Sequence, residues 1–401
     1  MRNQQIDALR AIAVLLVLGR HGIGQGLARL EFFSIWKRTG WVGVDLFFVL
    51  SGFLISGLLY SEYKRTRSIK VLNFYARRGL KIYPAFYALM GLTIASQLIL
   101  RFPSSFSFRP IFHELLFVQN YLGGVWWHTW SLAVEEHFYL VLPLVLWTMA
   151  KLSSRKDDPF FGVLPLFAVV ALVVLVLRTR AGLESAEPIR ACLFQSHMRI
   201  DALLCGVALG YLHHFRPAVF QSIPRSALLP VGLILITPCT LLPVEGEGVF
   251  MQTGGLTLIY LGFACILVFA LRTQIPAAGW GAVIVKRLAA VGYYSYSIYL
   301  WHLLVAFVMP WVGMWLARLH RPLLDAIYQY AHFPLYICLA LALGIMMARL
   351  IELPVLAIRD RVFPSRSTPL SVPAAEPSLA VTAIAQLQPT QPQPSLAAAS
   401  D

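Results

Sequence analysis

The chain has 401 residues, of which 58% are hydrophobic and 13% are charged, and its mean hydropathy is +0.69. This composition excludes an ordinary soluble globular protein and is typical of an integral membrane protein. The net charge of +14 does not indicate nucleic-acid binding, because the basic residues gather in loops between apolar spans rather than along one groove. We therefore expect the lipid bilayer, and no nucleic acid, as a partner.

Ten apolar stretches are long enough to cross about 30 Å of hydrocarbon. They lie near residues 6–26, 41–60, 82–101, 131–150, 160–178, 199–214, 226–243, 252–271, 289–314 and 333–353. The segment between the second and third spans carries a single acid, Glu62, against seven basic residues: Lys64, Arg65, Arg67, Lys70, Arg77, Arg78 and Lys81. Because short cytoplasmic loops are enriched in Lys and Arg, this bias places both termini in the cytoplasm. The predicted fold class is all-α: a polytopic membrane helix bundle of about ten transmembrane helices, in the inner (plasma) membrane.

Composition divides the chain into a transmembrane domain, residues 1–358, and a cytoplasmic tail, residues 359–401. The tail is rich in Pro, Ala, Ser and Gln and is expected to be disordered. The first span contains internal charges and lacks a small-residue cleavage site, so we expect it to remain as the first helix rather than to be removed as a signal peptide. The five cysteines show no paired spacing and predict neither a disulfide framework nor a metal site.

Two ionisable side chains, Arg10 and His21, lie in this otherwise apolar first span. Eleven steps along a helix return to within about 20° of the starting direction and rise about 16 Å, so the two side chains are predicted to share one face. Ionisable groups in hydrocarbon are costly and usually functional. The alternative is structural: Arg10 snorkels to the headgroups and His21 hydrogen-bonds a neighbouring helix.

Two neighbouring segments add further candidates. Asp45 lies near the outer end of the second span, where Ser51 and Gly52 would let a helix or a slim ligand approach closely. Arg78 and Lys81, three residues apart at the start of the third span, point the same way and can neutralise phosphates. Basic residues at a membrane edge also serve as topology signals and lipid anchors, which is the competing interpretation.

The segment that leads into the fourth span combines aromatic and acidic side chains. Trp130, Glu135 and Glu136 lie within a few residues of one another. Carboxylates with aromatic rings suit the hydroxyls and faces of a sugar, although tryptophans at this position also form interfacial belts. His302, much later in the chain, is by itself better explained as an interhelical hydrogen-bonding residue than as a catalyst.

Together these segments resemble the membrane-bound acyltransferase 3 family, and the resemblance runs from residue 5 to about residue 355. The matching segments follow the family's order: residues 7–10 with His21, 43–53, Arg77 and Arg78 with residues 82–84, 130–136, Arg199 with Asp201, 299–302 and 352–354.

The resemblance implies an integral-membrane O-acyltransferase of glycans, in the stand-alone form. The donor would be cytoplasmic acyl-CoA, most simply acetyl-CoA as a co-substrate, and the acceptor a carbohydrate hydroxyl of a surface or secreted glycan such as a lipopolysaccharide or exopolysaccharide. The family's essential arginine and histidine correspond to Arg10 and His21, and its acyl-CoA-binding arginine pair corresponds to Arg78 and Lys81, with Arg77 beside them. At position 81 this chain has a lysine where the family has an arginine. The lysine keeps the positive charge but cannot form the two parallel hydrogen bonds of a guanidinium group.

The expected mechanism places the acyl-CoA phosphates on the basic cluster and the acyl group near His21. The imidazole would act as a general base or carry the acyl group briefly, and the sequence leaves both roles open. The expected acceptor-binding residues are Glu135, Glu136, Trp130, Asp45 and Ser51. Two other functions remain open: a transporter or flippase that uses Arg10 and His21 as a substrate or proton pathway, and a regulatory membrane module.

Overall fold

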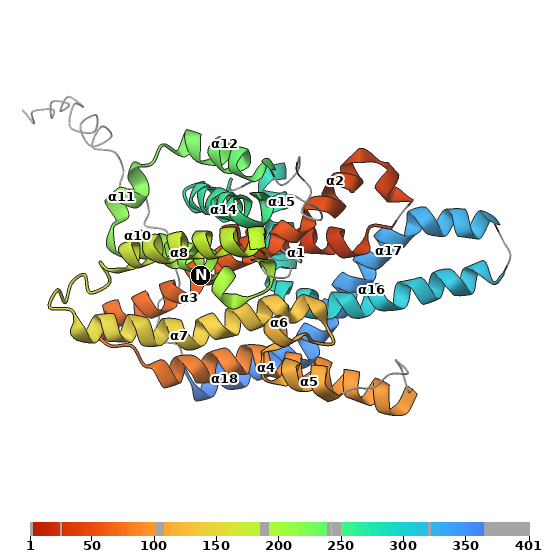
Figure 1. Cartoon of the computed structure of the whole chain (residues 1–401), viewed down its shortest axis with the longest axis horizontal. Helices are drawn as coiled ribbons and strands as arrows, with labels where there is room; N and C mark the ends of the chain where they lie inside the picture. Colours follow the sequence, from red (N-terminus) through yellow and green to blue (C-terminus); the bar gives the residue numbers. More distant parts are fainter. Residues whose placement is uncertain are drawn as a thin grey trace, which may run out of the picture. The chain divides into compact units, whose positions relative to one another are not determined.

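The computed structural model describes residues 3–24, 26–100, 108–184, 192–238, 242, 250–276, 278–319 and 322–364. Within these ranges the regular elements are helices and none is a strand, which confirms the all-α prediction (Figure 1). The longer helices are α1 (Gln4–Gly22), α3 (Gly43–Thr66), α4 (Val71–Leu100), α7 (Trp130–Leu152), α8 (Val163–Glu184), α10 (Ile200–Phe215), α12 (Arg225–Ile236), α14 (Leu256–Leu271), α15 (Trp280–Tyr293), α16 (Ser295–Ala317) and α17 (Pro322–Met347). The shorter helices are α2 (Glu31–Thr39), α5 (Phe108–Leu115), α6 (Gln119–Leu122), α11 (Pro217–Ser222) and α18 (Leu353–Val362).

Seven described segments are long and apolar enough to cross a membrane. They are Glu31–Thr66, Val71–Ile99, Trp127–Leu152, Val163–Glu184, Thr253–Leu271, Ser295–Leu316 and Ile327–Val362. Three further expected spans correspond to helices that do not meet this description: α10 and α12 are short, and α1 carries Asp7, Arg10 and Arg20. Length and composition therefore support seven spans. The count of ten stays a prediction, and parts of the expected spans at residues 25, 101, 239–241 and 243 lie outside the described residues.

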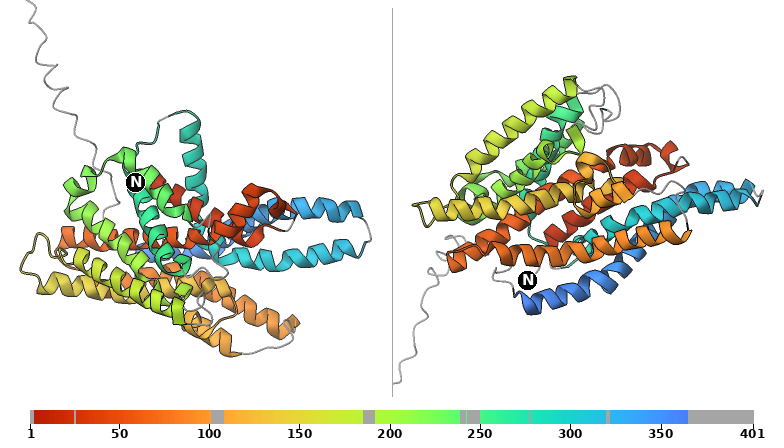
Figure 2. Two further views of the ribbon diagram at one scale, coloured as in Figure 1. Left: turned by 45° about the horizontal axis from the view of Figure 1, so that its top comes forward. Right: turned by 60° about the horizontal axis from the view of Figure 1, so that its bottom comes forward.

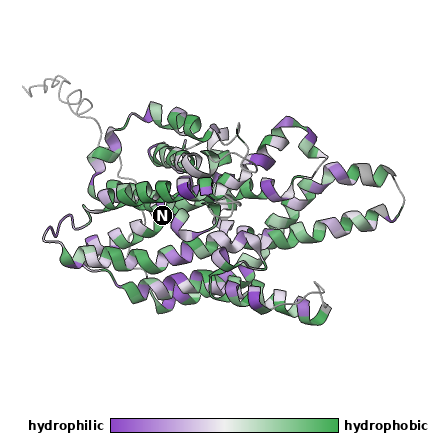
Figure 3. Ribbon diagram, in the orientation of Figure 1, coloured by the Kyte–Doolittle hydropathy of each residue, from purple (hydrophilic) through white to green (hydrophobic). Residues whose placement is uncertain are grey.

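Apolar side chains also cover the outside of the helices. On α8, Val169, Leu172, Val173 and Val176 are all exposed. Apolar residues predominate along most helices in Figure 3. Apolar surface on this scale is unfavourable in water and suits contact with lipid, so the surface agrees with a multi-pass membrane protein.

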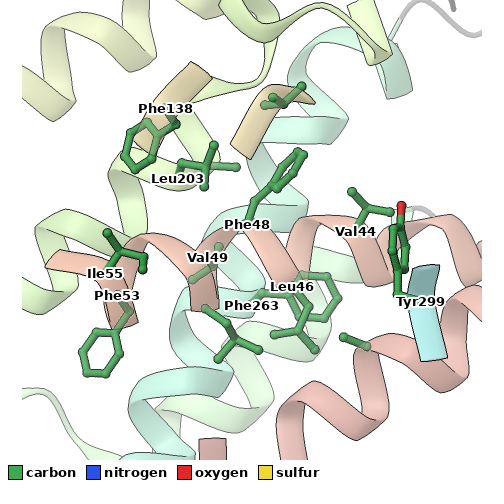
Figure 4. Close-up of a cluster of buried hydrophobic side chains, with 14 of the residues drawn as sticks. Val44, Leu46, Phe48, Val49, Phe53, Ile55, Phe138, Leu203, Phe263 and Tyr299 are labelled. Carbon is green, nitrogen blue, oxygen red and sulfur yellow. The ribbon is translucent and has the colours of Figure 1, made fainter. Parts of the chain in front are cut away.

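Helix α3 packs closely against α10 near the middle of the bundle. A Cβ atom on Gly52 would collide with the backbone oxygen of Leu203, and one on Gly206 would collide with that of Val49. Small residues let membrane helices approach to backbone contact, as the Ser51–Gly52 pair predicts. Around this contact, Phe48 and Phe53 of α3 lie among apolar side chains of neighbouring helices (Figure 4).

Helix α1 packs against α3, α15 and α16. Two more glycines bring its neighbours close: Gly43 at the start of α3 lies against the backbone of Ala13, and Gly292 of α15 lies against that of Asp7. Helices α16 and α17 run beside each other as a hairpin (Figure 2). The charged first span is therefore surrounded by protein, as its ionisable residues require.

Helix α18 continues past residue 359, where the tail was expected to begin. The Arg77 Nη2 atom lies 3.0 Å from Asp360 Oδ1, and Arg77 also donates to the backbone oxygen of Phe363. These contacts join the end of α18 to α4 and account for helix where composition alone predicted disorder. The remainder of the expected tail, residues 365–401, lies outside the described residues.

The α3–α10 contact generates a stability prediction. A valine at Gly52 would force its side chain into the α10 backbone, so Gly52→Val should lower the free energy of unfolding by about 1–3 kcal/mol. Gly91 of α4 is the matched control, because a Cβ there meets nothing within 4 Å. Gly91→Ala should raise stability by about 0.5–1 kcal/mol. Thermal melting of both variants in detergent tests this, and a Gly52→Val protein as stable as wild type would contradict the packing.

Candidate active site

Two adjacent cavities lie beside α1. The first has a volume of about 800 Å³ and is lined by residues of α1, α3, α4, α7, α16 and α18. The second has a volume of about 450 Å³ and is lined by residues of α1, α2, α3, α16 and the segments that precede α7 and α10. Val44 and Tyr299 line both cavities, so these two side chains form a wall between them. Both volumes are in the range of ligand-binding pockets.

The two ionisable residues of α1 line different cavities. Arg10 lines the first cavity and His21 lines the second. Residues 4–22 form one continuous helix, so the predicted rise of about 16 Å between them applies. The sequence predicts that one face of α1 carries both residues. In the structure this helix extends from the first cavity to the second.

His21 forms a hydrogen bond with a second histidine. Its Nδ1 atom lies 2.7 Å from Nε2 of His302 on α16, and the two rings are nearly parallel at 8°. The Nδ1 atom of His302 lies 2.6 Å from the backbone oxygen of Tyr299. A carbonyl oxygen can only accept, so Nδ1 of His302 carries the proton and its Nε2 accepts from Nδ1–H of His21. In this arrangement Nε2 of His21 has a lone pair with which to accept a proton.

Aromatic residues and a buried loop enclose this histidine pair. The Trp127 ring packs edge-on against His21 at 4.6 Å between centroids, and His128 packs edge-on against His302 at 5.1 Å. Glu114 of α5 holds the loop in place by accepting hydrogen bonds of 2.8 Å from the backbone N–H of Trp126 and of 2.8 Å from Oγ1 of Thr129. The surroundings of His21 are thus fixed by residues far from it in sequence.

Basic side chains in the first cavity face buried carboxylates. Arg78 Nη2 lies 3.8 Å from Glu135 Oε2, and its guanidinium carbon lies 4.0 Å from the centre of the Tyr139 ring. Lys81 Nζ lies 3.6 Å from Glu352 Oε1. Both cations come from α4, one turn apart, as their spacing predicts. The cavity as a whole is basic: Arg10, Arg77, Arg78, Lys81 and Arg359 line it against Asp7, Glu135 and Asp360.

The other predicted site residues lie in three places: the first cavity, the second cavity and the buried interior. Ser51 donates a 2.5 Å hydrogen bond to Glu135, and both line the first cavity with the basic cluster. Trp130 lines the second cavity. Glu136 is buried beside Tyr83, and Asp45 is fully buried against Arg199. The structure therefore brings Ser51 and Glu135 to Arg78, and separates them from the tryptophans with which Glu135 was expected to act.

Two ion pairs are buried near the start of α10, and one of them includes Arg199, which lines the second cavity. Arg199 Nη2 lies 2.6 Å from Asp45 Oδ1, and Arg178 Nη2 lies 2.6 Å from Asp201 Oδ2. Arg178 also donates to Thr257 at 2.9 Å. Sequence analysis named Asp45 and noted Arg199 and Asp201, but it missed Arg178, which the charge inside the apolar α8 segment would have indicated.

Sequence analysis placed Tyr299 and Glu352 in matching segments but gave no site role to them or to Trp127. In the structure Tyr299 lines both cavities, Trp127 packs beside His21, and Glu352 pairs with Lys81. Tyr299 donates a 2.9 Å hydrogen bond to the backbone oxygen of His128, which fixes its ring in the wall. Within the described residues, no group of three or more His, Cys, Asp or Glu side chains is arranged to hold a metal ion.

Comparison with known proteins finds relatives that are named as O-acetyltransferases. The chain is 28% identical over 322 residues to the O-acetyltransferase OatA of Staphylococcus aureus (strain NCTC 8325 / PS 47), an alignment that covers 74% of this chain and 49% of the relative. It is 28% identical over 325 residues to a second protein of S. aureus (strain COL), also named as an O-acetyltransferase, with 75% and 50% covered. The chain thus spans about half the length of the curated relatives it matches. No solved structure matches.

A family model described as an acyltransferase domain matches residues 3–349, a region that contains the second cavity, the lining of the first cavity other than Arg359 and Asp360, and nearly all of the helices described above. The chain therefore belongs to the acyltransferase 3 family that its motifs indicate.

Proposed function

We propose that this protein is an integral-membrane O-acyltransferase that moves an acyl group, most simply acetyl, from cytoplasmic acyl-CoA to a sugar hydroxyl of a surface or secreted glycan. Family membership and the names of the O-acetyltransferase relatives support the acyl transfer. The observation that carries the proposal is His21, which is hydrogen-bonded to His302 and lines a cavity that shares Val44 and Tyr299 with a basic cavity.

The first cavity is the proposed donor site. Its volume and excess of basic residues suit an elongated thioester with several phosphates. Arg78 and Lys81 would neutralise phosphates, while Arg77, which contacts Asp360, would add to the positive potential at the mouth. Glu135 would act on the donor side, because it holds Arg78 in place. Arg10, farther along α1, would draw the donor toward the wall formed by Val44 and Tyr299.

The second cavity is the proposed acceptor site, with His21 as the general base. Nε2 of His21 takes the proton of the acceptor hydroxyl while that oxygen bonds to the thioester carbonyl carbon. The tetrahedral intermediate collapses, the carbon–sulfur bond breaks, and the proton passes from His21 to the departing thiolate. The products are the sugar ester and free CoA. His302 acts through His21 by fixing its ring and tautomer, and is a positioning residue.

The proposed topology follows from charge. The segment between α3 and α4 is strongly basic, which favours the cytoplasmic side for it and for the mouth of the first cavity. The second cavity then faces the outer side of the inner (plasma) membrane, where surface glycans are assembled. About ten spans and two cytoplasmic termini fit this orientation.

The first of three predictions about function concerns His21. His21→Ala should lower acyl transfer from acetyl-CoA by about 10²–10⁴-fold, because the general base is lost. Transfer should be measured on purified protein in detergent, with melting temperature and size-exclusion profile as controls for folding. A folded His21→Ala protein with full activity would contradict the assignment. Wild-type protein that works only in sealed vesicles would instead favour a transporter.

The second prediction separates positioning from packing at His302. His302→Leu leaves Nδ1–H of His21 buried without an acceptor, which costs about 1–3 kcal/mol, so kcat should fall roughly 5- to 150-fold. His302→Gln, whose amide oxygen can accept the same hydrogen bond, should recover part of this loss. Equal kcat values for the two variants, at equal melting temperatures, would rule out the positioning role.

The third prediction concerns the donor site. Arg78→Ala should raise the KM for acetyl-CoA roughly 10- to 150-fold with a smaller change in kcat, because a charge-assisted hydrogen bond to phosphate is worth about 1.5–3 kcal/mol. Arg155→Ala, at an exposed basic residue outside both cavities, is the control and should leave KM unchanged. An unchanged KM in a folded Arg78→Ala protein would exclude Arg78 from donor binding.

A further inference from the structure

The second cavity is basic, and the orientation of the protein in the membrane does not explain its positive charges. Four cationic side chains line it, Arg20, Lys37, Arg38 and Arg199, and its described lining contains no Asp or Glu. Asp45, which lies outside this lining, pairs with Arg199. The positive-inside rule disfavours Lys and Arg on the outer side of the membrane, where the proposed topology places this cavity. Their presence there requires a reason other than membrane orientation.

Arg199 lines this cavity and has donors that lack a hydrogen-bond partner within the described residues. Its side chain is only 1% exposed, and Nη2 is engaged by Asp45, but Nε and Nη1 make no hydrogen bond within the described residues. The guanidinium lies 5.6 Å from the ring centre of Phe48 and 5.8 Å from that of Trp130, so aromatic faces hold it in place. Buried guanidinium donors without partners are costly, and an anionic ligand would satisfy them.

Helix α2 supplies the opposite side of the cavity. Ser34, Lys37 and Arg38 lie within one or two turns of this nine-residue helix and all line the second cavity. Arg20 of α1 donates to the backbone oxygen of Lys37 at 3.5 Å, which joins α2 to the helix that carries His21. The cationic side chains are therefore attached to the same structural unit as the proposed general base.

We propose that the acceptor is anionic: a sugar that carries a carboxylate or a phosphate, bound through Arg199 and Lys37 with its reacting hydroxyl at Nε2 of His21. The tryptophans at Trp127 and Trp130 would pack against the sugar ring. The inference rests on the proposed function, since it names the substrate class of the same site. Acidic sugar units and phosphate-bearing sugars present the same chemistry to the cavity, and the experiment below distinguishes them.

The test compares matched acceptors on the full chain in detergent. The probes are methyl glucuronide and methyl galacturonide, their neutral glucoside and galactoside counterparts, and glucose 6-phosphate. Binding is measured first, as the thermal shift of His21→Ala protein, which does not depend on transfer. Transfer is then measured with wild-type protein and acetyl-CoA. The anionic probes should bind and react better than the neutral ones by roughly 10- to 150-fold, the range for a charge-assisted hydrogen bond.

Variants connect this preference to the cavity. Lys37→Gln should reduce the ratio of anionic to neutral acceptor binding several-fold, because it removes one cation of the lining. Arg29→Gln is the matched control: Arg29 lies on the same segment between α1 and α3, is exposed, and lines neither cavity. That variant should keep the wild-type ratio. Arg199→Gln combined with Asp45→Asn removes the buried pair without leaving an unpaired charge, and should reduce the ratio further.

Each outcome of these measurements either supports or overturns the inference that the acceptor is anionic. A larger shift with the uronides identifies a carboxylate-bearing acceptor, and a larger shift with glucose 6-phosphate identifies a phosphate-bearing one. Equal responses to anionic and neutral probes, no response to any anionic probe, or an equal loss in Lys37→Gln and Arg29→Gln would overturn the inference. Anion-selective binding without transfer would retain the inference about the cavity and contradict the proposed enzymatic function.

Discussion

Burial of charge in a low-dielectric bundle is the constraint on which the rest of this structure depends. An unpaired ion in hydrocarbon costs several kcal/mol, so each buried cation needs a counter-charge from another helix. Asp45–Arg199 joins α3 to the start of α10, and Arg78–Glu135 joins α4 to α7. The same pairs define the walls of both cavities. Side chains that maintain the architecture are therefore also those that set the electrostatics of the proposed site.

This constraint gives the two cavities different characters. The first contains carboxylates opposite its cations, and a donor with several phosphates would bind by competing for those cations. The second has no acid in its described lining, and part of Arg199 lacks a partner. Val44 and Tyr299 line both cavities, so the proposed donor would pass these two side chains to reach His21. Two separate cavities that share a wall would suit the proposed reaction, whose substrates arrive from opposite sides of a membrane.

Sequence periodicity and composition predicted the parts of this arrangement that depend on a single helix. The helical first span, the shared face of Arg10 and His21, and the close approach at Gly52 follow from local spacing and small residues. The contact between His21 and His302 joins positions 281 residues apart, and no local pattern encodes it. For the same reason Glu135 was grouped with its neighbours in sequence, whereas helix packing places it beside Arg78. Tertiary packing, which determines partners, was the missing information.

The central claim is that the acyl group passes from the first cavity to His21 across the shared wall. A structure of the protein with a non-hydrolysable acetyl-CoA analogue tests it most directly. The account predicts the phosphates at Arg78 and Lys81, the pantetheine arm between Val44 and Tyr299, and the acyl carbonyl within reach of Nε2 of His21. An analogue bound outside the first cavity, or with its acyl end directed away from His21, would contradict the account.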